Sequence, residues 1–298
     1  MRFGSVHTVA GRQARAAWMF LAPGLLLLTL FTAWPLVRTA YLSFTEYSLL
    51  TPPEWVGLEN YRALLGDDQV TNAFQNTVLY AAVVTPVTIA LALALAMALN
   101  ARFFGRGIVR TAVFVPFVVS LAVVSIAFRF LLDPNYGLVT HWLSAVGLAP
   151  TQGALAQPGT AMAAVMAVGV WKNVGFYMVM FLAGLQSIPS DLYEAAQLDG
   201  ASRLQKFRAV TLPLLSNQTM LVSILAAIAS FQVFDQIKVM TNGGPAMSTE
   251  TLVVLVNRVG ISNLEFGYGS AVSVVLLLLI LAFSLVQYLY FGRRQVRY

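Results

Sequence analysis

Long uncharged apolar stretches, separated by short polar segments, dominate this sequence. A helix needs about 20 apolar residues to cross the hydrocarbon core of a bilayer, and its backbone groups must be hydrogen-bonded within the segment. Six stretches reach this length, so the sequence predicts six transmembrane helices. They span Trp18–Tyr41, Ala73–Leu99, Thr111–Leu132, Ala161–Leu185, Leu214–Phe234 and Ala271–Phe291. Short segments of alternating polarity, which a membrane barrel would require, do not occur. The predicted fold class is all-α, a polytopic membrane protein.

The first predicted helix follows the basic residues Arg12 and Arg15, an arrangement that secretory signal peptides share. Its apolar stretch is longer than the roughly 7–15 residues of a signal-peptide core, and no small-residue cleavage site follows it. We therefore expect this helix to be retained. The predicted organisation is an N-terminal segment 1–16, a six-helix transmembrane domain 17–292 that includes a folded loop at 187–213, and a C-terminal tail 293–298.

Composition supports a membrane protein and excludes several kinds of chemistry. Hydrophobic residues make up 58% of the chain and charged residues 10%, with a mean hydropathy of +0.75, whereas soluble domains carry about 25% charged residues. The absence of cysteine excludes disulfides, thiolate metal sites and a cysteine nucleophile. His7 and His141 lie far apart in sequence and have no metal-ligand spacing. We therefore predict no metal site and no catalytic residues.

Basic residues gather in every second connection between the predicted helices. Twelve of the 18 lysines and arginines lie in the N-terminal segment, two loops and the C-terminal tail. These are Arg2, Arg12, Arg15, Arg102, Arg106, Arg110, Arg203, Lys206, Arg208, Arg293, Arg294 and Arg297. The opposite loops hold only Arg62, Lys238 and Arg258. Because short cytoplasmic loops are enriched in Lys and Arg, both termini are expected in the cytoplasm. Basic residues spread in this way do not form a nucleic-acid-binding patch.

The three connections expected outside the cell differ in composition. Residues 45–72 combine five carboxylates with proline, tryptophan and tyrosine, which indicates a folded, partly amphipathic segment. Residues 133–159 are rich in glycine and proline. Residues 235–269 contain Thr-Asn-Gly-Gly-Pro at 241–245, a sequence that predicts a turn within this loop.

The most informative segment is the cytoplasmic loop 187–213. Asp191 is expected to be the N-cap of a short helix. Glu194 follows three residues later, at the N3 position of a capping box, whose side chain can bond back to the N-cap backbone. Gly200 suits the position just after the end of this helix. The apolar side of the helix consists of Leu192, Ala195, Ala196 and Leu198.

A second short helix is predicted to start after Ser202, which is followed by Gln205 in the spacing of a capping box. Pro213 then fits the first turn of the fifth transmembrane helix, where its missing N–H is tolerated. The loop would present a rigid knob with an exposed carboxylate at Glu194. From the pattern alone, an amphipathic loop lying on the membrane surface is an equally good interpretation.

The same loop carries a family resemblance. Glu194-Ala195-Ala196, then Gly200, then Val210-Thr211-Leu212-Pro213, resembles the EAA signature of ABC importer permeases, with Val210 where that family often has isoleucine. Further segments resemble the carbohydrate-uptake branch of the family, namely 57–61, 76–77, 182–189 and 241–245. The resemblance extends over nearly the whole chain from the first helix onward.

This resemblance implies a type I ABC importer fold, in which the loop forms a coupling helix that docks into a cleft of a cytoplasmic ATPase. It implies that Glu194 binds a basic residue of the ATPase and that Gly200 permits the turn. The residues implied in this ATPase contact are Glu194, Ala195, Ala196, Leu198, Asp199, Gly200, Leu212 and Pro213.

The chain has no phosphate-binding loop of the Gly-x-x-x-x-Gly-Lys-Ser/Thr type, since none of its three lysines has that context. ATP and magnesium are therefore expected on a separate ATPase chain, so this chain would hold no cofactor and would not be an enzyme. The resemblance implies further partners: a second, homologous but different permease subunit, two copies of the ATPase and an extracellular solute-binding protein. The location implied is the plasma membrane of a bacterium or archaeon, in contact with membrane lipid.

Lys172 is the only charge deep inside a predicted helix, and an intramembrane charge faces a polar cavity or a partner. Resemblance to permeases similar to the maltose importer places sugar contacts at Gly169, Lys172, Asn173 and Phe176 in one helix, and at Ala226, Ala229, Ser230 and Val233 in a later one. The second set is mostly apolar here. The predicted substrate contacts are Gly169, Lys172, Asn173, Phe176 and Ser230. The alternative is that Lys172 pairs with a second permease or with a carbonyl group.

The function predicted from the resemblance is import of a sugar by alternating access, driven by ATP hydrolysis in a separate subunit. Because Lys172 would attract a phosphate, glycerol 3-phosphate or a glycerophosphodiester is an alternative cargo. An ion-gradient-driven carrier would need intramembrane carboxylates or broken helices, and no Asp or Glu lies inside the six predicted helices. An intramembrane enzyme would need a cluster of catalytic groups, and the sequence shows none.

Overall fold

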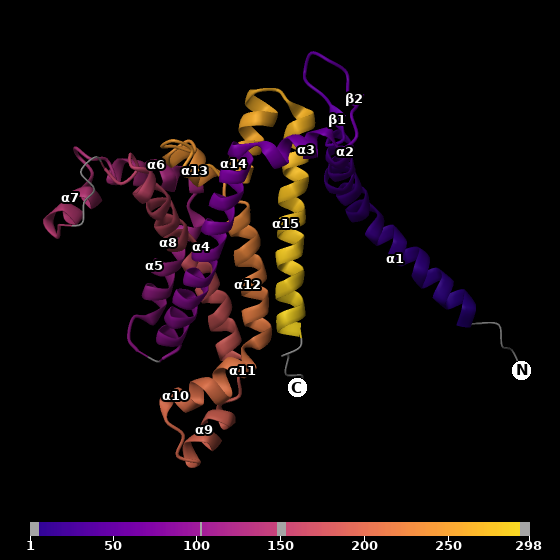
Figure 1. Ribbon diagram of the computed structural model, residues 1–298. Helices are drawn as coiled ribbons and strands as arrows, with labels where there is room; N and C mark the ends of the chain where they lie inside the picture. Colours follow the sequence, from indigo (N-terminus) through magenta and orange to yellow (C-terminus); the bar gives the residue numbers. More distant parts are fainter. Residues whose placement is uncertain (1–5, 102, 148–152, 293–298) are drawn as a thin grey trace, which may run out of the picture.

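The computed structural model describes all residues except 1–5, 102, 148–152 and 293–298, and it is almost entirely helical (Figure 1). The elements are α1 (Val6–Leu28), η1 (Thr29–Ala33), α2 (Trp34–Leu42), β1 (Thr45–Glu46), β2 (Glu54–Trp55), α3 (Glu59–Gly66), α4 (Asp68–Asn100), α5 (Arg106–Val118), α6 (Leu121–Leu131), α7 (Leu138–Ala145), α8 (Pro158–Gln186), α9 (Ser190–Leu198), α10 (Arg203–Lys206), η2 (Phe207–Thr211), α11 (Leu212–Leu214), α12 (Ser216–Phe231), α13 (Asp235–Met240), α14 (Leu252–Val256), η3 (Asn257–Ser262) and α15 (Phe266–Gly292). Elements labelled η are π-helical.

Within the described residues, five helical segments are long and apolar enough to cross a membrane, or six if one bent pair is counted as a span. The five are Ala16–Leu42, Asp68–Asn100, Pro158–Gln186, Ser216–Met240 and Phe266–Tyr290. Each coincides with a predicted run, which confirms the predicted helices. No Asp or Glu lies inside the predicted helices, and Asp68 and Asp235 fall within observed spans because those spans extend beyond the predicted bounds at 73 and 234.

The third predicted run, 111–132, is not one continuous helix. It forms α5 and α6, which meet at an angle of 98°. Between them Val119 is extended, with φ −68° and ψ 142°, and Ser120 precedes α6 with a similar backbone. Pro116 lies in the last turn of α5, where it removes one backbone donor and so weakens the helix just before the break.

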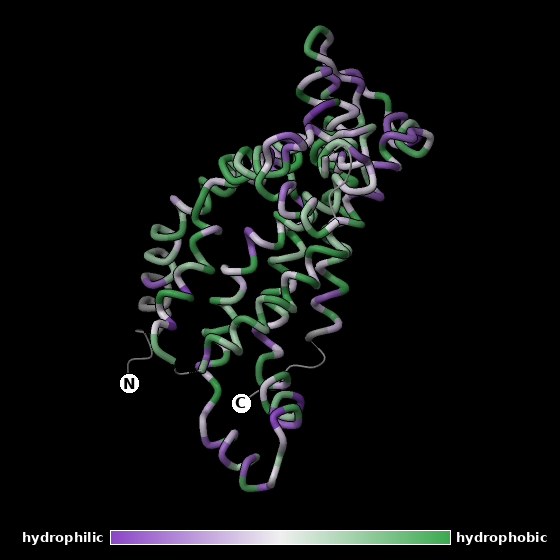
Figure 2. Tube along the Cα trace, turned by 90° about the vertical axis from the view of Figure 1, so that its left-hand side faces the viewer, coloured by the Kyte–Doolittle hydropathy of each residue, from purple (hydrophilic) through white to green (hydrophobic). Residues whose placement is uncertain are grey.

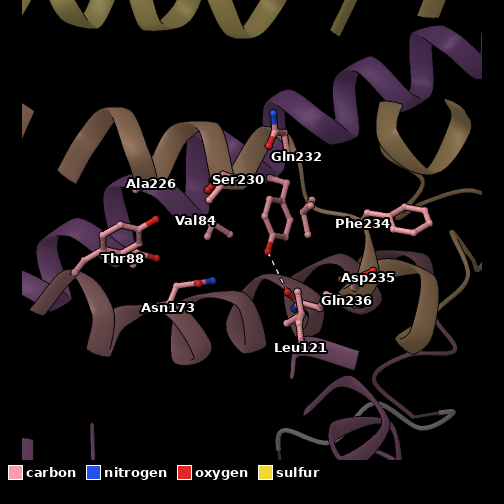
Figure 3. Close-up of a pocket in the computed structure, with 14 residues that line it drawn as sticks. Val84, Thr88, Leu121, Asn173, Ala226, Ser230, Gln232, Phe234, Asp235 and Gln236 are labelled. Atoms are coloured by element: carbon pink, nitrogen blue, oxygen red, sulfur yellow. Dashed lines mark hydrogen bonds between the residues drawn. The ribbon is translucent and has the colours of Figure 1, made fainter. Parts of the chain in front are cut away.

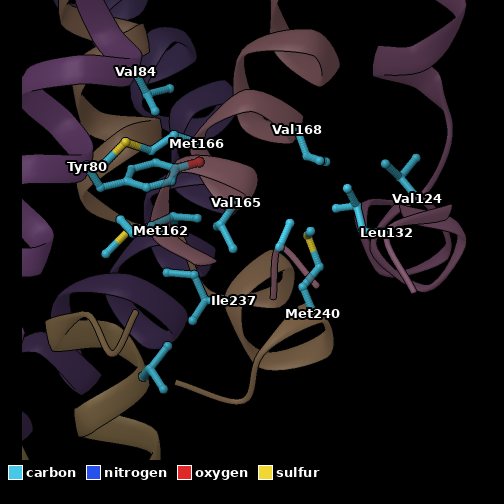
Figure 4. Packing of buried hydrophobic residues seen from close by; sticks show 13 residues of the cluster. Tyr80, Val84, Val124, Leu132, Met162, Val165, Met166, Val168, Ile237 and Met240 are labelled. Atoms are coloured by element: carbon cyan, nitrogen blue, oxygen red, sulfur yellow. The ribbon is translucent and has the colours of Figure 1, made fainter. Parts of the chain in front are cut away.

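The core of the bundle is the contact between α4 and α8, with α12 and α5 packed alongside. At Gly175 of α8 the backbones come so close that an added Cβ would collide with the carbonyl of Val113 in α5. Tyr80, Met166 and Ile237 belong to a buried cluster that joins α4, α8 and α13 (Figure 4). Small residues at helix contacts are the usual way in which membrane helices approach closely.

The segment α1–η1–α2 stands apart from the bundle. The most apolar window of Ala16–Leu42 has no buried residue, and Figure 1 shows α1 leaning away from the other helices. Only its last part, α2, packs against α15 and the start of β1. A large apolar helix surface is therefore left for lipid or for another subunit.

A small folded cap covers the end of the bundle opposite α9 and α10 (Figure 1). It contains the antiparallel pair β1–β2, with Thr45 opposite Trp55, together with α3 and α14. Residues 235–269, predicted as a loop, instead hold α13, α14 and η3. The predicted turn at 241–245 is confirmed by the hydrogen bond from Gly244 N to Thr241 O (3.0 Å). Figure 2 shows that hydrophilic residues gather at the two ends and apolar ones between them.

Candidate functional site

The loop at 187–213 folds as two short helices that project from one end of the bundle (Figure 1). The first, α9, ends in a Schellman motif, since Gly200 N donates to Gln197 O (3.0 Å) and Ala201 N donates to Ala196 O (2.9 Å). Gly200 has φ +75°, a conformation that glycine adopts without strain. The predicted turn at Gly200 is therefore confirmed.

The predicted start of α9 is wrong, because Pro189 precedes the helix, Ser190 is its first residue and no side chain caps it. Asp191 instead lies in the first turn, where a negative charge still suits the helix dipole. The second predicted start is confirmed: Ser202 and Gln205 form a complete capping box for α10. Pro213 lies in the short α11, ahead of the long helix α12 rather than in its first turn.

Side chains at the tip of this loop have no partner in the bundle. Glu194 is exposed and takes part in no ion pair among the described residues, and Leu198 has an exposed fraction of 90%. Behind them, the hydroxyls of Tyr193 and Thr211 lie 3.0 Å apart and tie α9 to η2. An exposed carboxylate beside an exposed leucine on a tethered helix is suited to contact another protein.

Between α4, α8 and α12 lies a cavity of about 250 Å³ (Figure 3). It is lined by Tyr80, Val84, Thr88, Leu121, Asn173, Tyr177, Ala226, Ala229, Ser230, Gln232, Val233, Phe234, Asp235 and Gln236. Asn173 of α8 and Ser230 of α12 face this space from two sides (Figure 3). The lining mixes hydroxyls, amides and aromatic rings.

Hydrogen bonds orient several of these polar groups. Asn173 Nδ2 donates to Gly169 O (2.9 Å), which leaves its side-chain oxygen available as an acceptor. Thr85 Oγ1 donates to Ser230 Oγ (3.1 Å), and Tyr80 Oη donates to Gln236 Oε1 (3.3 Å). The buried hydroxyl of Thr88 has no hydrogen-bond partner within the described residues, so it is an unpaired polar group at the edge of the cavity.

Lys172 does not line this cavity. Its side chain is buried, with an exposed fraction of 6%, and Nζ donates to Phe117 O (2.6 Å) and lies 5.2 Å from the centre of the Phe117 ring. Phe117 is in the last turn of α5, where carbonyl groups have no partner within the helix. The ammonium group thus caps the broken helix, and the predicted alternative, a pairing with a carbonyl, describes its position.

Of the five predicted substrate contacts, the structure brings Asn173 and Ser230 together at the cavity. Gly169 lies behind the lining, where an added Cβ would collide with the Tyr80 hydroxyl. Phe176 stacks on Phe117, with ring centres 4.4 Å apart, and does not line the cavity. The role of these residues in binding stays a prediction.

Several lining residues were missed from the sequence, above all Tyr80 and Thr88 of α4 together with Gln232 and Gln236. A signal for the first two exists, since Tyr80, Val84 and Thr88 follow one another at four-residue intervals and share one helix face. Polar residues that share one face of an otherwise apolar helix, as Tyr80 and Thr88 do, indicate that this face is buried in the protein.

Replacing Lys172 with methionine is expected to destabilise the protein without any cargo present. Loss of the ammonium group leaves the Phe117 carbonyl without its hydrogen-bond donor. An unsatisfied buried polar group lowers the free energy of unfolding by about 1–3 kcal/mol. The measurement is the melting temperature of the purified chain in detergent, with Lys238→Met as the control. An unchanged melting temperature, combined with lost cargo binding, would instead make Lys172 a cargo contact.

These features define a class of protein: a multi-spanning helical membrane protein with a polar cavity between its spans and a folded helical loop that projects from one end. A model of the family described as "Binding-protein-dependent transport system inner membrane component" matches residues 88–296. The chain belongs to this family, whose members are inner-membrane components of transport systems.

Similar proteins agree with this assignment and confirm the resemblance seen in the sequence. The trehalose/maltose transport system permease protein MalF of Thermococcus litoralis is 34% identical over 95% of each chain. The sulfoquinovosyl glycerol transport system permease protein SmoG of Agrobacterium fabrum is 35% identical over 87% of this chain and 85% of that protein. The sn-glycerol-3-phosphate permease UgpA of the same organism is 33% identical, covering 93% and 94%.

A solved structure shares the fold. It is a bacterial ABC transporter involved in the import of the acidic polysaccharide alginate, with a TM-score of 0.83 and 22% identity. The match covers 95% of this chain and 96% of that one. The predicted type I importer fold is therefore confirmed.

Proposed function

We propose that this chain is one of two permease subunits of an importer that carries a neutral sugar across the inner membrane. The lining of the cavity between α4, α8 and α12 is the observation that carries the proposal. Hydroxyl and amide groups of Thr88, Asn173 and Ser230 surround a space beside the ring of Tyr177. Sugars present hydroxyls at their edges and C–H groups on their faces, and this mixture of groups can bind both.

The charge of the lining favours a neutral cargo over glycerol 3-phosphate or a glycerophosphodiester. Asp235 is the single charged side chain among the described residues that line the cavity, and the ammonium group of Lys172 is bound to a carbonyl elsewhere. A phosphate in this space would meet a carboxylate and no cation. Unpaired like charges of this kind are a common source of discrimination between ligands.

A second permease subunit completes the pathway in this proposal. The cavity of about 250 Å³ is smaller than the roughly 300–1,000 Å³ typical of ligand pockets. The exposed apolar surface of α1 and α2 is available to pack against the second subunit.

The remaining partners follow from the two ends of the molecule. The loop 187–213 lies on the same side of the molecule as the ends of α1, α4 and α15 that adjoin the basic segments (Figure 1). Enrichment in basic residues supports a cytoplasmic location for this side. There the exposed Glu194 and Leu198 dock on an ATPase, present in two copies, that binds ATP and magnesium. The folded cap at the other end receives an extracellular solute-binding protein.

Uptake by the reconstituted importer tests this proposal. The tagged chain is purified from its own membranes with the subunits that accompany it, placed in liposomes with ATP, and assayed with labelled maltose, trehalose and glycerol 3-phosphate. We expect uptake of a neutral sugar and a loss of about tenfold for Asn173→Ala or Ser230→Ala, which each remove one cargo hydrogen bond. Ser223→Ala, on the same helix α12 but away from the cavity, is the matched control. Uptake of glycerol 3-phosphate alone would contradict the neutral-cargo proposal.

A further inference from the structure

A second cavity, of about 380 Å³, lies between the loop 187–213 and the end of the bundle from which the loop projects. It is lined by Met97 and Asn100 of α4, Leu185 of α8, Tyr193 of α9, Arg203 and Lys206 of α10, and Phe207 and Thr211 of η2. It faces the bundle, away from the exposed tip formed by Glu194 and Leu198. No carboxylate lines it among the described residues.

Two cations meet in this cavity without a counterion. Arg203 takes part in no ion pair within the described part of the chain, and Lys206 Nζ donates only to the neutral side chain of Gln197 (3.2 Å). The lining also contains the linked hydroxyls of Tyr193 and Thr211 and the side-chain amide of Asn100, and the rest of it is apolar. A guanidinium with a nearby ammonium and hydroxyl donors is the donor set that binds a phosphate.

The depth of the cavity relative to the bilayer indicates the source of that phosphate. Helix α4 has 33 residues and is therefore about 50 Å long, whereas a bilayer with its headgroups is about 40–45 Å thick. A helix of this length can span the hydrocarbon core and bring Asn100, at its end, to the headgroup layer. Basic pockets between helices on the cytoplasmic side are suited to anionic lipid headgroups.

We propose that this cavity binds the phosphate group of an anionic phospholipid of the inner leaflet. The bound phosphate bridges Arg203 and Lys206 to the end of α4 and so holds the loop 187–213 against the bundle. The proposal rests on the proposed function only for the orientation of this loop toward the cytoplasm. It assigns a lipid site within the segment through which an ATPase would act.

Lipid binding to the full chain, purified in nonionic detergent with its accompanying subunits, tests the proposal. The probe is short-chain phosphatidylglycerol, with phosphatidylcholine for comparison, and the readouts are the dissociation constant and the rise in melting temperature on binding. The variant Arg203→Gln/Lys206→Gln is expected to bind phosphatidylglycerol about 30-fold more weakly, since each basic residue contributes attraction to anionic lipid. Phosphatidylcholine should not raise the melting temperature.

The matched control is Arg106→Gln/Arg208→Gln, which removes two charges from the same side of the molecule outside the cavity. It should bind phosphatidylglycerol as the unmodified chain does. Equal weakening in both variants, or none in the first, would overturn the site. Displacement of the lipid by millimolar inorganic phosphate would overturn the lipid assignment and identify free phosphate as the occupant. Neither readout requires cargo, ATP or transport, so failure of the sugar proposal leaves this test intact.

Discussion

Replacing Glu194 with lysine is expected to abolish the association of this chain with its ATPase and, with it, transport. Glu194 is exposed at the tip of α9, where no group of the described chain balances its charge. In the proposed complex it meets a basic residue of the ATPase, so the reversed charge turns an attraction into a repulsion. Like charges brought together at an interface cost several kcal/mol, which lowers affinity by about 100-fold or more.

Co-purification from native membranes measures this effect directly. An ATPase should accompany the tagged chain and be lost from Glu194→Lys, whereas Glu54→Lys, an exposed reversal in the cap at the opposite end, should retain it. If the unmodified chain brings down no ATPase in mild detergent, the coupling-loop proposal fails. If Glu194→Lys keeps both the ATPase and transport, the loop docks through other residues.

Long apolar runs made the transmembrane helices predictable, but not the break in the third run. Residues 111–132 are hydrophobic apart from Thr111, Pro116, Ser120, Ser125 and Arg129. Hydrophobicity indicates burial in lipid and not the direction of the backbone. The bend at Val119 exposes the last carbonyls of α5, and one of them is bound by Lys172 from a different helix. A contact between residues 55 positions apart cannot be read from either segment alone.

The π-helical segments show a similar limit. Two of them, η1 and η2, end two residues before a proline, Pro35 and Pro213 respectively. Proline offers no N–H to the carbonyl four residues earlier, and a wider turn is one way for the chain to adjust. Both prolines are evident in the sequence, but whether the preceding turn becomes π-helical depends on the residues that pack around each helix.

The loop 187–213 could be predicted from the sequence to a greater extent than the cavity between α4, α8 and α12. The loop is local, so glycine at 200 and the Ser202–Gln205 pair determine its turns through neighbours in sequence. The cavity is assembled from α4, α8 and α12, and family resemblance supplied only the contributions of α8 and α12. Tyr80 and Thr88 could be assigned to the cavity only from the structure, because packing against α8 determines which face of α4 lines it.

Removing Arg258 is expected to destabilise the folded cap at the end of the bundle opposite α9 and α10. Arg258 Nε donates to Glu250 Oε1 (2.8 Å) and its Nη2 donates to Glu250 Oε2 (3.0 Å) and to Gln69 Oε1 (2.7 Å). The hydrogen bond with Glu250 raises the pKa of Arg258. The Glu250 side chain has an exposed fraction of only 4%, and Asn76 Nδ2 donates to its backbone carbonyl (3.0 Å), so the pair ties this loop to α4.

The variant Arg258→Met leaves a buried carboxylate unpaired, which costs about 3–5 kcal/mol and should lower the melting temperature by about 10 °C in a chain of this size. The double variant Arg258→Met/Glu250→Gln removes the stranded charge as well, so it should recover much of the loss. Arg62→Met, an exposed change in the same cap, should have no effect. If the double variant is as unstable as the single one, the effect comes from the lost Gln69 contact and packing rather than from the buried charge.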